Sequence, residues 1–188
     1  MSRTGCPSDM ADAEDYRRLF AYNHRVFERF LKAVGELPWE EAAKPRGAGH
    51  ESLTGTLLHI LGVYEGWLGY ILPGRARELQ ALRKARGAEP PPRSHAAIRR
   101  ESLRVWKIVT RTLRKLTDEE LNRRVKAPWM PGYYTVEDAL WQTTLEEAHH
   151  LGEIIALFWQ MDRKPPQMVW ILNRPPLRPA RGGHSGEP

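Results

Sequence analysis

Helical periodicity of apolar residues constrains the fold most, because four long segments of the chain show it. We expect helices over about residues 12–37, 52–72, 95–116 and 135–162. Pro38 ends the first segment, Ser52 is a good N-cap for the second, and Thr135-Val-Glu-Asp opens the fourth with nearly a capping box. Four amphipathic helices in 188 residues predict an all-α fold, a four-helix bundle with long connections.

The chain ends set the expected domain limits. We assign residues 12–162 to one bundle domain and expect residues 1–11 to be a disordered N-terminus. Residues 163–188 are rich in Pro and Arg, which predicts a tail that is partly docked and partly disordered. The predicted connections are the loops 38–51 and 118–134 and a short extra helix at 75–86.

The composition is that of an ordinary globular domain, with 41% hydrophobic and 28% charged residues. No apolar run approaches the roughly 20 residues that a membrane helix needs, and no secretory signal is recognisable. Cys6 is the only cysteine, which excludes an internal disulfide and a thiolate-rich metal site. We therefore expect a soluble cytoplasmic protein. The net charge of +6 is spread without a basic stripe, so nucleic-acid binding is not expected.

The fourth predicted helix carries two polar residues on its apolar, core-facing stripe. On a wheel of about 100° per residue, Glu146 falls one turn before His150 on that stripe. Glu147 lies near the edge of the stripe, and His149 lies about 100° away from His150. A buried unpaired carboxylate is costly, and i,i+4 spacing lets two side chains converge on one divalent cation. The alternative is a salt-bridged pair in the core.

The second predicted helix places His59 among three glycines, Gly55, Gly62 and Gly66. Glycine inside a helix costs about 0.5–1 kcal/mol relative to Ala, so three of them indicate close packing or space kept open. Open space beside a ligand is what a substrate-accepting metal site needs. The alternative for His59 is an imidazole that is simply hydrogen-bonded in the core. Asn23, on the apolar stripe of the first helix, has the same two interpretations, a core hydrogen bond or support of the site.

The order of these motifs resembles that of the DinB-like superfamily, the group that includes the DinB and YfiT proteins. Its members have an Asn in an early helix, a second helix that begins at Ser and carries a His, and a late His pair spaced i,i+4. The matching residues in this chain are Tyr22-Asn23, Ser52 with His59, Glu65-Gly66-Trp67, and Glu146 with His150. The resemblance covers about residues 12–162 and implies a helical bundle that carries a metal ion.

The resemblance implies a three-ligand site made of His59, Glu146 and His150. Glu146 is a departure, since many members have His at this place, but a carboxylate there would still ligate. Two imidazoles and one carboxylate suit Ni(II), Zn(II), Fe(II) or Mn(II), and the sequence does not choose among them. Glu147 and His149 are the fallback ligands.

Characterised relatives of the superfamily include thiol-dependent transferases and isomerases, in which a metal binds a low-molecular-weight thiol. The resemblance therefore implies a divalent-metal-binding protein, with thiol S-transfer to a small-molecule substrate as the expected activity. One alternative is a metal-dependent hydrolase that uses metal-bound water, with Glu147 or Glu153 as base. Another is a non-enzymatic helical dimer with a structural or vestigial metal site. We expect a homodimer, with the apolar segment Met168–Leu172 docked on the body or on a second subunit.

Overall fold

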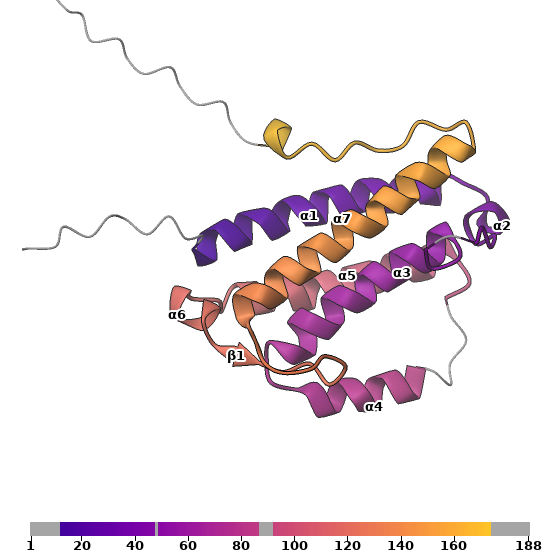
Figure 1. Cartoon of the computed structure of the whole chain (residues 1–188). Helices are drawn as coiled ribbons and strands as arrows, with labels where there is room; N and C mark the ends of the chain where they lie inside the picture. The colour runs from indigo at the N-terminus through magenta and orange to yellow at the C-terminus, as the bar shows by residue number, and fades with distance from the viewer. Residues whose placement is uncertain (1–11, 48, 87–91, 174–188) are drawn as a thin grey trace, which may run out of the picture.

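Four long helices form the body of the protein (Figure 1). The structure is a computed structural model, and it describes residues 12–47, 49–86 and 92–173. The long helices are α1 (Ala13–Gly35), α3 (Leu53–Tyr64), α5 (His95–Leu113) and α7 (Val136–Gln160). The expected all-α four-helix bundle is therefore confirmed. The expectations for residues 1–11 and for the tail beyond residue 173 lie outside the described residues.

The helices begin where side chains satisfy their first backbone N–H groups. The carboxylate of Asp12 accepts from the N–H of Asp15, and a capping box joins the same two residues. Ser52 caps α3 with its hydroxyl, and Thr135 forms a second capping box with Asp138 at the start of α7. Free N–H groups at a helix start need such partners, so these side chains fix the points at which the site-bearing helices begin.

Helix α3 continues without a break into a wider helical segment. This π-helix, η1 (Glu65–Ile71), contains Gly66 and Gly69, and its Trp67 carbonyl accepts from the N–H of Leu72 at 2.8 Å. The expected extra helix is present as α4 (Ala76–Arg86). A π-helical turn is rare and recurs near functional sites, and here it carries Trp67 toward the pocket described below.

Two segments that we expected to be loops contain short elements. The first holds α2 (Trp39–Ala42), and the second holds α6 (Asp118–Leu121) and a two-stranded antiparallel sheet. In that sheet β1 (Arg124–Val125) pairs with β2 (Tyr134–Thr135), with Arg124 opposite Thr135. Elements of two to four residues are too short to show a periodic pattern, which is why the sequence did not reveal them.

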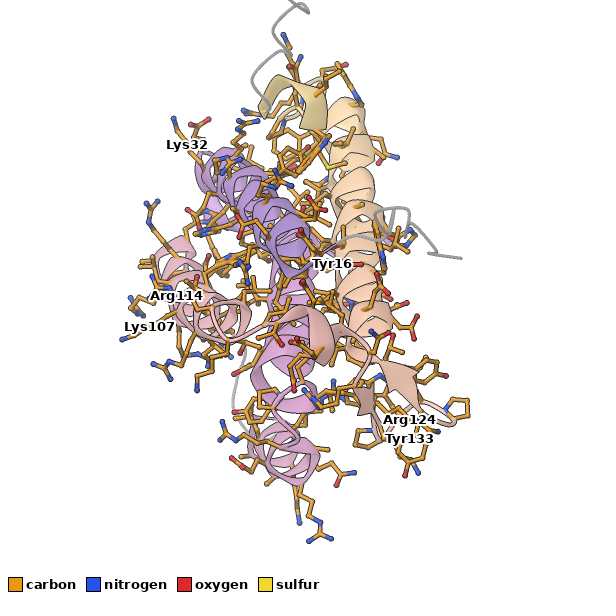
Figure 2. All side chains as sticks on the ribbon, turned by 90° about the vertical axis from the view of Figure 1, so that its left-hand side faces the viewer. Tyr16, Lys32, Lys107, Arg114, Arg124 and Tyr133 are labelled. Atoms are coloured by element: carbon orange, nitrogen blue, oxygen red, sulfur yellow. The ribbon has the colours of Figure 1, made fainter. Side chains whose placement is uncertain are left out.

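The hairpin lies at one end of the bundle, where Figure 2 labels Arg124 and Tyr133. The guanidinium of Arg124 lies 4.7 Å from the centre of the Tyr133 ring, a cation–π contact that holds the two strands' side chains together. Lys107 on α5 and Arg114, the residue that follows α5, point away from the body (Figure 2). The buried residues of this helix, among them Ile98, Val105 and Val109, form the apolar stripe that faces the core.

The core lies between the four long helices. Its fully buried members include Phe27 and Phe30 of α1, Leu57 and Ile60 of α3, and Ile154 of α7. Helix α3 packs against both α5 and α7. The side of α3 that faces α7 carries His59, so the packing of these two helices positions the candidate site.

The tail turns back after α7 and runs along α1 (Figure 1). Asp162 adopts a left-handed conformation with φ 53°, and residues 170–173 form the 3₁₀-helix η2 (Trp170–Asn173). The Trp170 ring meets the Tyr22 ring edge-on at 5.0 Å, and Met168 packs against the core. The apolar tail segment therefore lies on the body of its own chain, although Ile171 stays 74% exposed. Among the described helices, none has the length and apolar character that crossing a membrane requires.

Candidate metal centre

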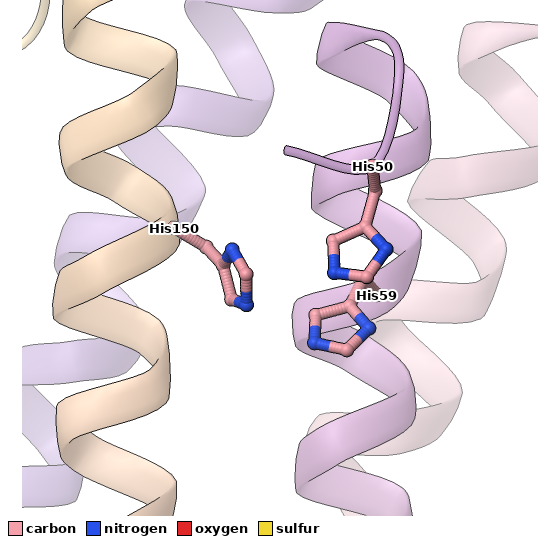
Figure 3. Close-up of side chains that lie close together, drawn as sticks. All are labelled: His50, His59 and His150. Carbon is pink, nitrogen blue, oxygen red and sulfur yellow. The ribbon is translucent and has the colours of Figure 1, made fainter. Parts of the chain in front are cut away.

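The structure brings the three predicted ligands together between α3 and α7. His59 and His150 face each other across the gap, with ring centres 4.5 Å apart (Figure 3). One oxygen of Glu146, Oε2, lies 3.2 Å from Nε2 of His150 and 3.8 Å from Nε2 of His59. The convergence expected from the helical wheel is therefore present in the fold.

A fourth group, His50, joins this cluster although the sequence analysis missed it. Its ring stacks on that of His59 at a centre distance of 3.5 Å and lies 4.9 Å from the ring of His150 (Figure 3). One nitrogen from each of the three histidines lies within 4.8 Å of the others. We call His50, His59, Glu146 and His150 the histidine cluster.

Two glycines hold the loop that carries His50 in place. A Cβ at Gly49, where φ is +54°, would overlap the carboxylate of Glu153 on α7. A Cβ at Gly55 would overlap the backbone carbonyl of His50. Only glycine permits both approaches, so the loop before α3 lies close to α7 and directs His50 toward His59.

Hydrogen bonds on the outer side of the cluster orient its members. Nδ1 of His150 lies 2.8 Å from Oε2 of Glu153, which leaves Nε2 of His150 facing Glu146 and His59. The amide of Gln142 donates to Oε1 of Glu146 at 2.7 Å, which leaves Oε2 of Glu146 facing the two histidines. A carboxylate behind a ligating imidazole is a recurrent feature of metal sites, since it fixes the tautomer and orientation of the ring.

The surroundings favour the neutral form of two imidazoles of this cluster, His59 and His50. Burial, followed by the neighbouring His50 and His150, lowers the pKa of His59 to about 4. Burial, followed by His150, also lowers the pKa of His50. Neutral imidazole is the form that binds a metal ion, so protons compete little with a metal at neutral pH.

These residues fit a divalent transition metal. With bonds of about 2.0–2.2 Å, two ligands of one tetrahedral ion lie roughly 3.4 Å apart. The distances from Glu146 to His150 and to His59, 3.2 and 3.8 Å, bracket that separation. Imidazoles with one carboxylate suit Ni(II), Zn(II), Fe(II) and Mn(II), and no cysteine is among these residues to favour a softer ion.

The two fallback ligands lie elsewhere. Glu147, expected at the edge of the apolar stripe, is more buried than Glu146, because it points between α1 and α3. It accepts from the Tyr64 hydroxyl at 2.5 Å, and Asn23 donates to the same hydroxyl at 3.2 Å. Burial raises the pKa of Glu147 to about 8. We call Asn23, Tyr64 and Glu147 the tyrosine cluster.

His149 is not one of the converging groups of the histidine cluster. Its side chain is 68% exposed, and its Nε2 lies 3.4 Å from Oε1 of Glu153. Together with His150 and Glu153 it forms a second group of closely spaced ligand atoms. In that group, however, Glu153 already bonds to Nδ1 of His150, so His149 has the more peripheral position.

A pocket of about 400 Å³ opens beside the histidine cluster. His59 and Glu146 line it, together with Trp67 of η1 and Trp129 of the hairpin loop, whose rings meet edge-on at 5.5 Å. The loop before α7 therefore forms one rim of the pocket through Trp129. The guanidinium of Arg83 lies over the Trp129 ring at 4.3 Å and adds a positive charge to the rim.

The glycines beside His59 serve two purposes. Gly62 and Gly66 line the pocket, and no other group lies within 4 Å of a Cβ placed at Gly62. Gly55 instead admits the backbone of His50, as described above. The space that we expected beside His59 is therefore present on one side, and close packing is present on the other.

A helical bundle with a cluster of imidazoles and a carboxylate between two helices, beside a pocket, defines the class of protein. The family model of the DinB superfamily matches residues 22–154, and the chain therefore belongs to the DinB superfamily. The chain is also 24% identical over 160 residues to the uncharacterized protein YizA of Bacillus subtilis (strain 168). That match covers 82% of this chain and 92% of the relative.

Proposed function

We propose that this chain binds one divalent metal ion through His59, Glu146 and His150, with His50 as an additional ligand. The observation that supports the proposal is the convergence of four groups whose outer atoms are already hydrogen-bonded or stacked, while their inner nitrogen and oxygen atoms face one another. The carboxylate of Glu146 is half-buried beside the imidazoles of His59 and His150, and a metal ion would compensate its charge.

The activity that we propose is metal-dependent thiol S-transfer. A bound metal would lower the pKa of a low-molecular-weight thiol and present it as a thiolate. The residues around it would hold the ligand set in place through Glu153 and Gln142, and the pocket would receive the second reactant. Trp67 and Trp129 would contact its apolar part, and Arg83 would pair with an anionic group on it.

The number of ligands bears on the choice of metal. Four protein ligands complete the shell of a tetrahedral Zn(II) ion, whereas a six-coordinate ion keeps two positions for a thiol and a second reactant. A transfer reaction is therefore better served by Ni(II), Fe(II) or Mn(II). Zn(II) with all four ligands would favour the alternative of a non-enzymatic helical dimer with a structural ion.

The hydrolase alternative has less support. It needs a base near a metal-bound water, and the two carboxylates expected for that role are both engaged. Glu153 accepts from His150, and Glu147 accepts from Tyr64 in the tyrosine cluster. Thiol transfer requires no such base on the protein, since a metal-bound thiol is already acidic.

Metal loading tests the first part of the proposal. Metal-free protein is incubated separately with Ni(II), Zn(II), Fe(II) and Mn(II), desalted, and subjected to elemental analysis. We expect one equivalent per chain, with none retained by His59→Ala or His150→Ala and full retention by the control His149→Ala. Wild-type protein that retains no metal, or a His149→Ala variant that alone loses it, would contradict the proposed ligand set.

Thiol binding tests the second part. Co(II)-loaded protein is titrated with 2-mercaptoethanol, and we expect a saturable sulfur-to-metal charge-transfer band in the near ultraviolet. Absence of the band at saturating thiol would overturn the transferase proposal. In that case, ester hydrolysis without added thiol would favour the hydrolase, and a metal that does not exchange would favour the structural ion.

Two further expectations from the sequence stay proposals. We propose that the chain forms a homodimer, and the exposed apolar face of α7 described below supports this. We also retain the cytoplasm as the proposed location, on the ground of the single cysteine.

A further inference from the structure

Helix α7 carries an apolar row on the side that faces away from the bundle. Its members are spaced alternately by four and three residues, which keeps them on one face over five turns. They are Trp141, Leu145, Ala148, Gly152, Ile155 and Trp159, and we call them the α7 row. No member is charged.

Most of the row is exposed within the described part of the chain, and Ile155 is half-buried against the edge of the core. Leu145 and Trp159 are each 60% exposed, and Trp141 is 46% exposed. Ala148 and Gly152 between them are exposed as well. Single exposed apolar residues are ordinary, but a row of them along one long helix marks a surface that another molecule covers.

The row is approximately palindromic in residue type and in spacing. About the level of residue 150, Trp141 corresponds to Trp159, Leu145 to Ile155, and Ala148 to Gly152. An interface between two identical chains related by a two-fold axis must be complementary to itself in this way. A partner of a different kind would not require such symmetry, so the pattern points to a second copy of this chain.

The centre of the row is shaped for close contact between helices. Ala148 and Gly152 have the smallest side chains of the row, and no atom lies within 4 Å of a Cβ placed at Gly152. Small residues at a crossing point let two helix axes approach closely while larger side chains pack on either side. The two tryptophans at the ends would then each cover the partner's end of the row.

The charges at the two ends of α7 fix the orientation. Glu137 and Asp138 lie in the first turn, and the exposed Arg163 and Lys164 follow the last turn. An antiparallel pair places the acidic end of one helix beside the basic end of the other, whereas a parallel pair places like charges together. Opposite charges favour association and like charges oppose it, so the antiparallel pair is preferred.

We propose that two copies of this chain form a dimer by packing their α7 rows antiparallel, about a two-fold axis at the level of residue 150. This gives a surface to the homodimer within the proposed function and does not depend on the metal. Around α7 the row is centred roughly 180° from His150 and about 140° from Glu146, at about 100° per residue. Both pockets would therefore stay open to solvent in the dimer.

Mass measurement by light scattering at micromolar concentration tests the surface. We expect wild-type protein at twice the chain mass of 21.7 kDa, and Leu145→Glu and Gly152→Arg at the mass of one chain. Gly152→Arg replaces a glycine in a helix interior, and the new side chain would extend into open space. The circular dichroism spectrum and the melting temperature of the variant should therefore stay native-like. The matched control is Leu103→Glu, on an equally exposed leucine of α5, and it should remain dimeric.

Cysteine cross-linking tests the orientation. In a Cys6→Ser background, Ala148→Cys and Gly152→Cys proteins are oxidised separately and as a mixture. The antiparallel pair predicts faster cross-linking in the mixture, because position 148 of one chain would face position 152 of its partner. A parallel pair predicts the reverse, since each introduced thiol would then face its own copy.

The proposal would be overturned by any of three results. The first is a monomeric wild type, the second is a Leu103→Glu variant that dissociates while Leu145→Glu stays dimeric, and the third is faster cross-linking of either cysteine variant alone than of the mixture. Metal content is measured on the same samples. A monomer that still binds metal would refute this inference and leave the metal proposal intact. A dimer that binds no metal would refute the metal proposal and leave this inference intact.

Discussion

Two polar clusters share helix α7 and differ in how their burial is compensated. In the tyrosine cluster, Glu147 bonds to Tyr64, and its raised pKa means that the carboxyl keeps its proton at neutral pH. In the histidine cluster, the bonds to Glu153 and Gln142 lie on the outside, and Oε2 of Glu146 faces Nε2 of His150 and Nε2 of His59 on the inside. In the first cluster a hydrogen bond from Tyr64 holds one carboxyl oxygen of Glu147, and the other, Oε1, is buried away from the pocket without a partner among the described residues. In the second, atoms of several side chains converge beside the pocket.

The comparison teaches that a buried polar group does not by itself mark a site. Glu147 is more deeply buried than Glu146, yet it lies away from the pocket that Glu146 lines. A candidate site is better recognised by nitrogen and oxygen atoms of several side chains that converge at the border of a cavity. The predictions that follow change one cluster and use the other as the reference.

The largest effect is expected when an inward-facing imidazole is removed. His150→Ala should weaken metal binding by at least ~100-fold, because the remaining groups no longer surround the ion. Tyr64→Phe, in the tyrosine cluster, should change the affinity by less than about threefold. Isothermal titration with Ni(II) and Zn(II) measures both, and equal losses would remove the distinction between the clusters.

A change of stability with pH is expected from the tyrosine cluster. The pKa of Glu147 is raised, so the folded chain holds a proton that the unfolded chain releases, and stability falls as pH rises from about 4.5 toward about 8. Glu147→Gln removes this loss. At pH 9 the variant should be more stable than the wild type, by roughly 5 kcal/mol, while at pH 5 the two should be similar.

Urea denaturation at pH 5, 7 and 9 measures this difference. The matched control is Glu36→Gln, on an exposed residue at the end of α1, which should show the same pH dependence as the wild type. Metal affinity of Glu147→Gln should stay near that of the wild type. If Glu147→Gln followed the wild-type pH profile, the carboxyl would be ionised in the fold.

A smaller effect is expected from the carboxylate behind His150. Glu153→Gln should weaken metal binding by roughly 10–100-fold, since an amide orients the imidazole less well and leaves it less basic. The overall fold should not change, because Glu153 is partly exposed. Titration with Zn(II) together with far-UV circular dichroism separates the two effects, and unchanged affinity would show that the Glu153 bond does not matter.

The smallest effect is expected from the loop that carries His50. Gly49→Ala should lower metal affinity by about tenfold, because its Cβ displaces Glu153 and shifts His50. Gly47→Ala is the matched control, since Gly47 also has a positive φ but has no other group within 4 Å. Both variants strain the backbone, and only Gly49→Ala should change the metal titration.

The long helices and the core of the site were predictable because they follow from periodicity. Residues four apart on α7, and a histidine among glycines on α3, repeat on one face and can be placed by a helical wheel. The wheel placed His59, Glu146 and His150 on core-facing sides, and the resemblance to the DinB-like superfamily implied that they are the ligands. The wheel was less accurate about burial, because it predicted that Glu146 would be more buried than Glu147. In the structure α7 packs against α1 and α3, and Glu147 is the more buried of the two.

His50 and the short elements were not predictable on the same ground. His50 lies in a loop, where apolar residues do not repeat at a regular spacing. Its position depends on the close approach of Gly49 to Glu153, which is far away in the sequence, and of Gly55 to the backbone carbonyl of His50. The signal in the sequence was a histidine between Gly49 and the N-cap Ser52, directly before the helix that carries His59. Glycines that allow close approach are recognisable as such only when the neighbouring chain is known.

The central claim is that the histidine cluster holds one divalent ion between α3 and α7. Anomalous diffraction from crystals of the Zn(II)- or Ni(II)-loaded protein, recorded at the metal edge, tests it most directly. The account predicts one anomalous peak per chain, within bonding distance of three atoms: Nε2 of His59, Nε2 of His150 and Oε2 of Glu146. A loaded protein with no peak there, or with its peak only at His149 and Glu153, would contradict it.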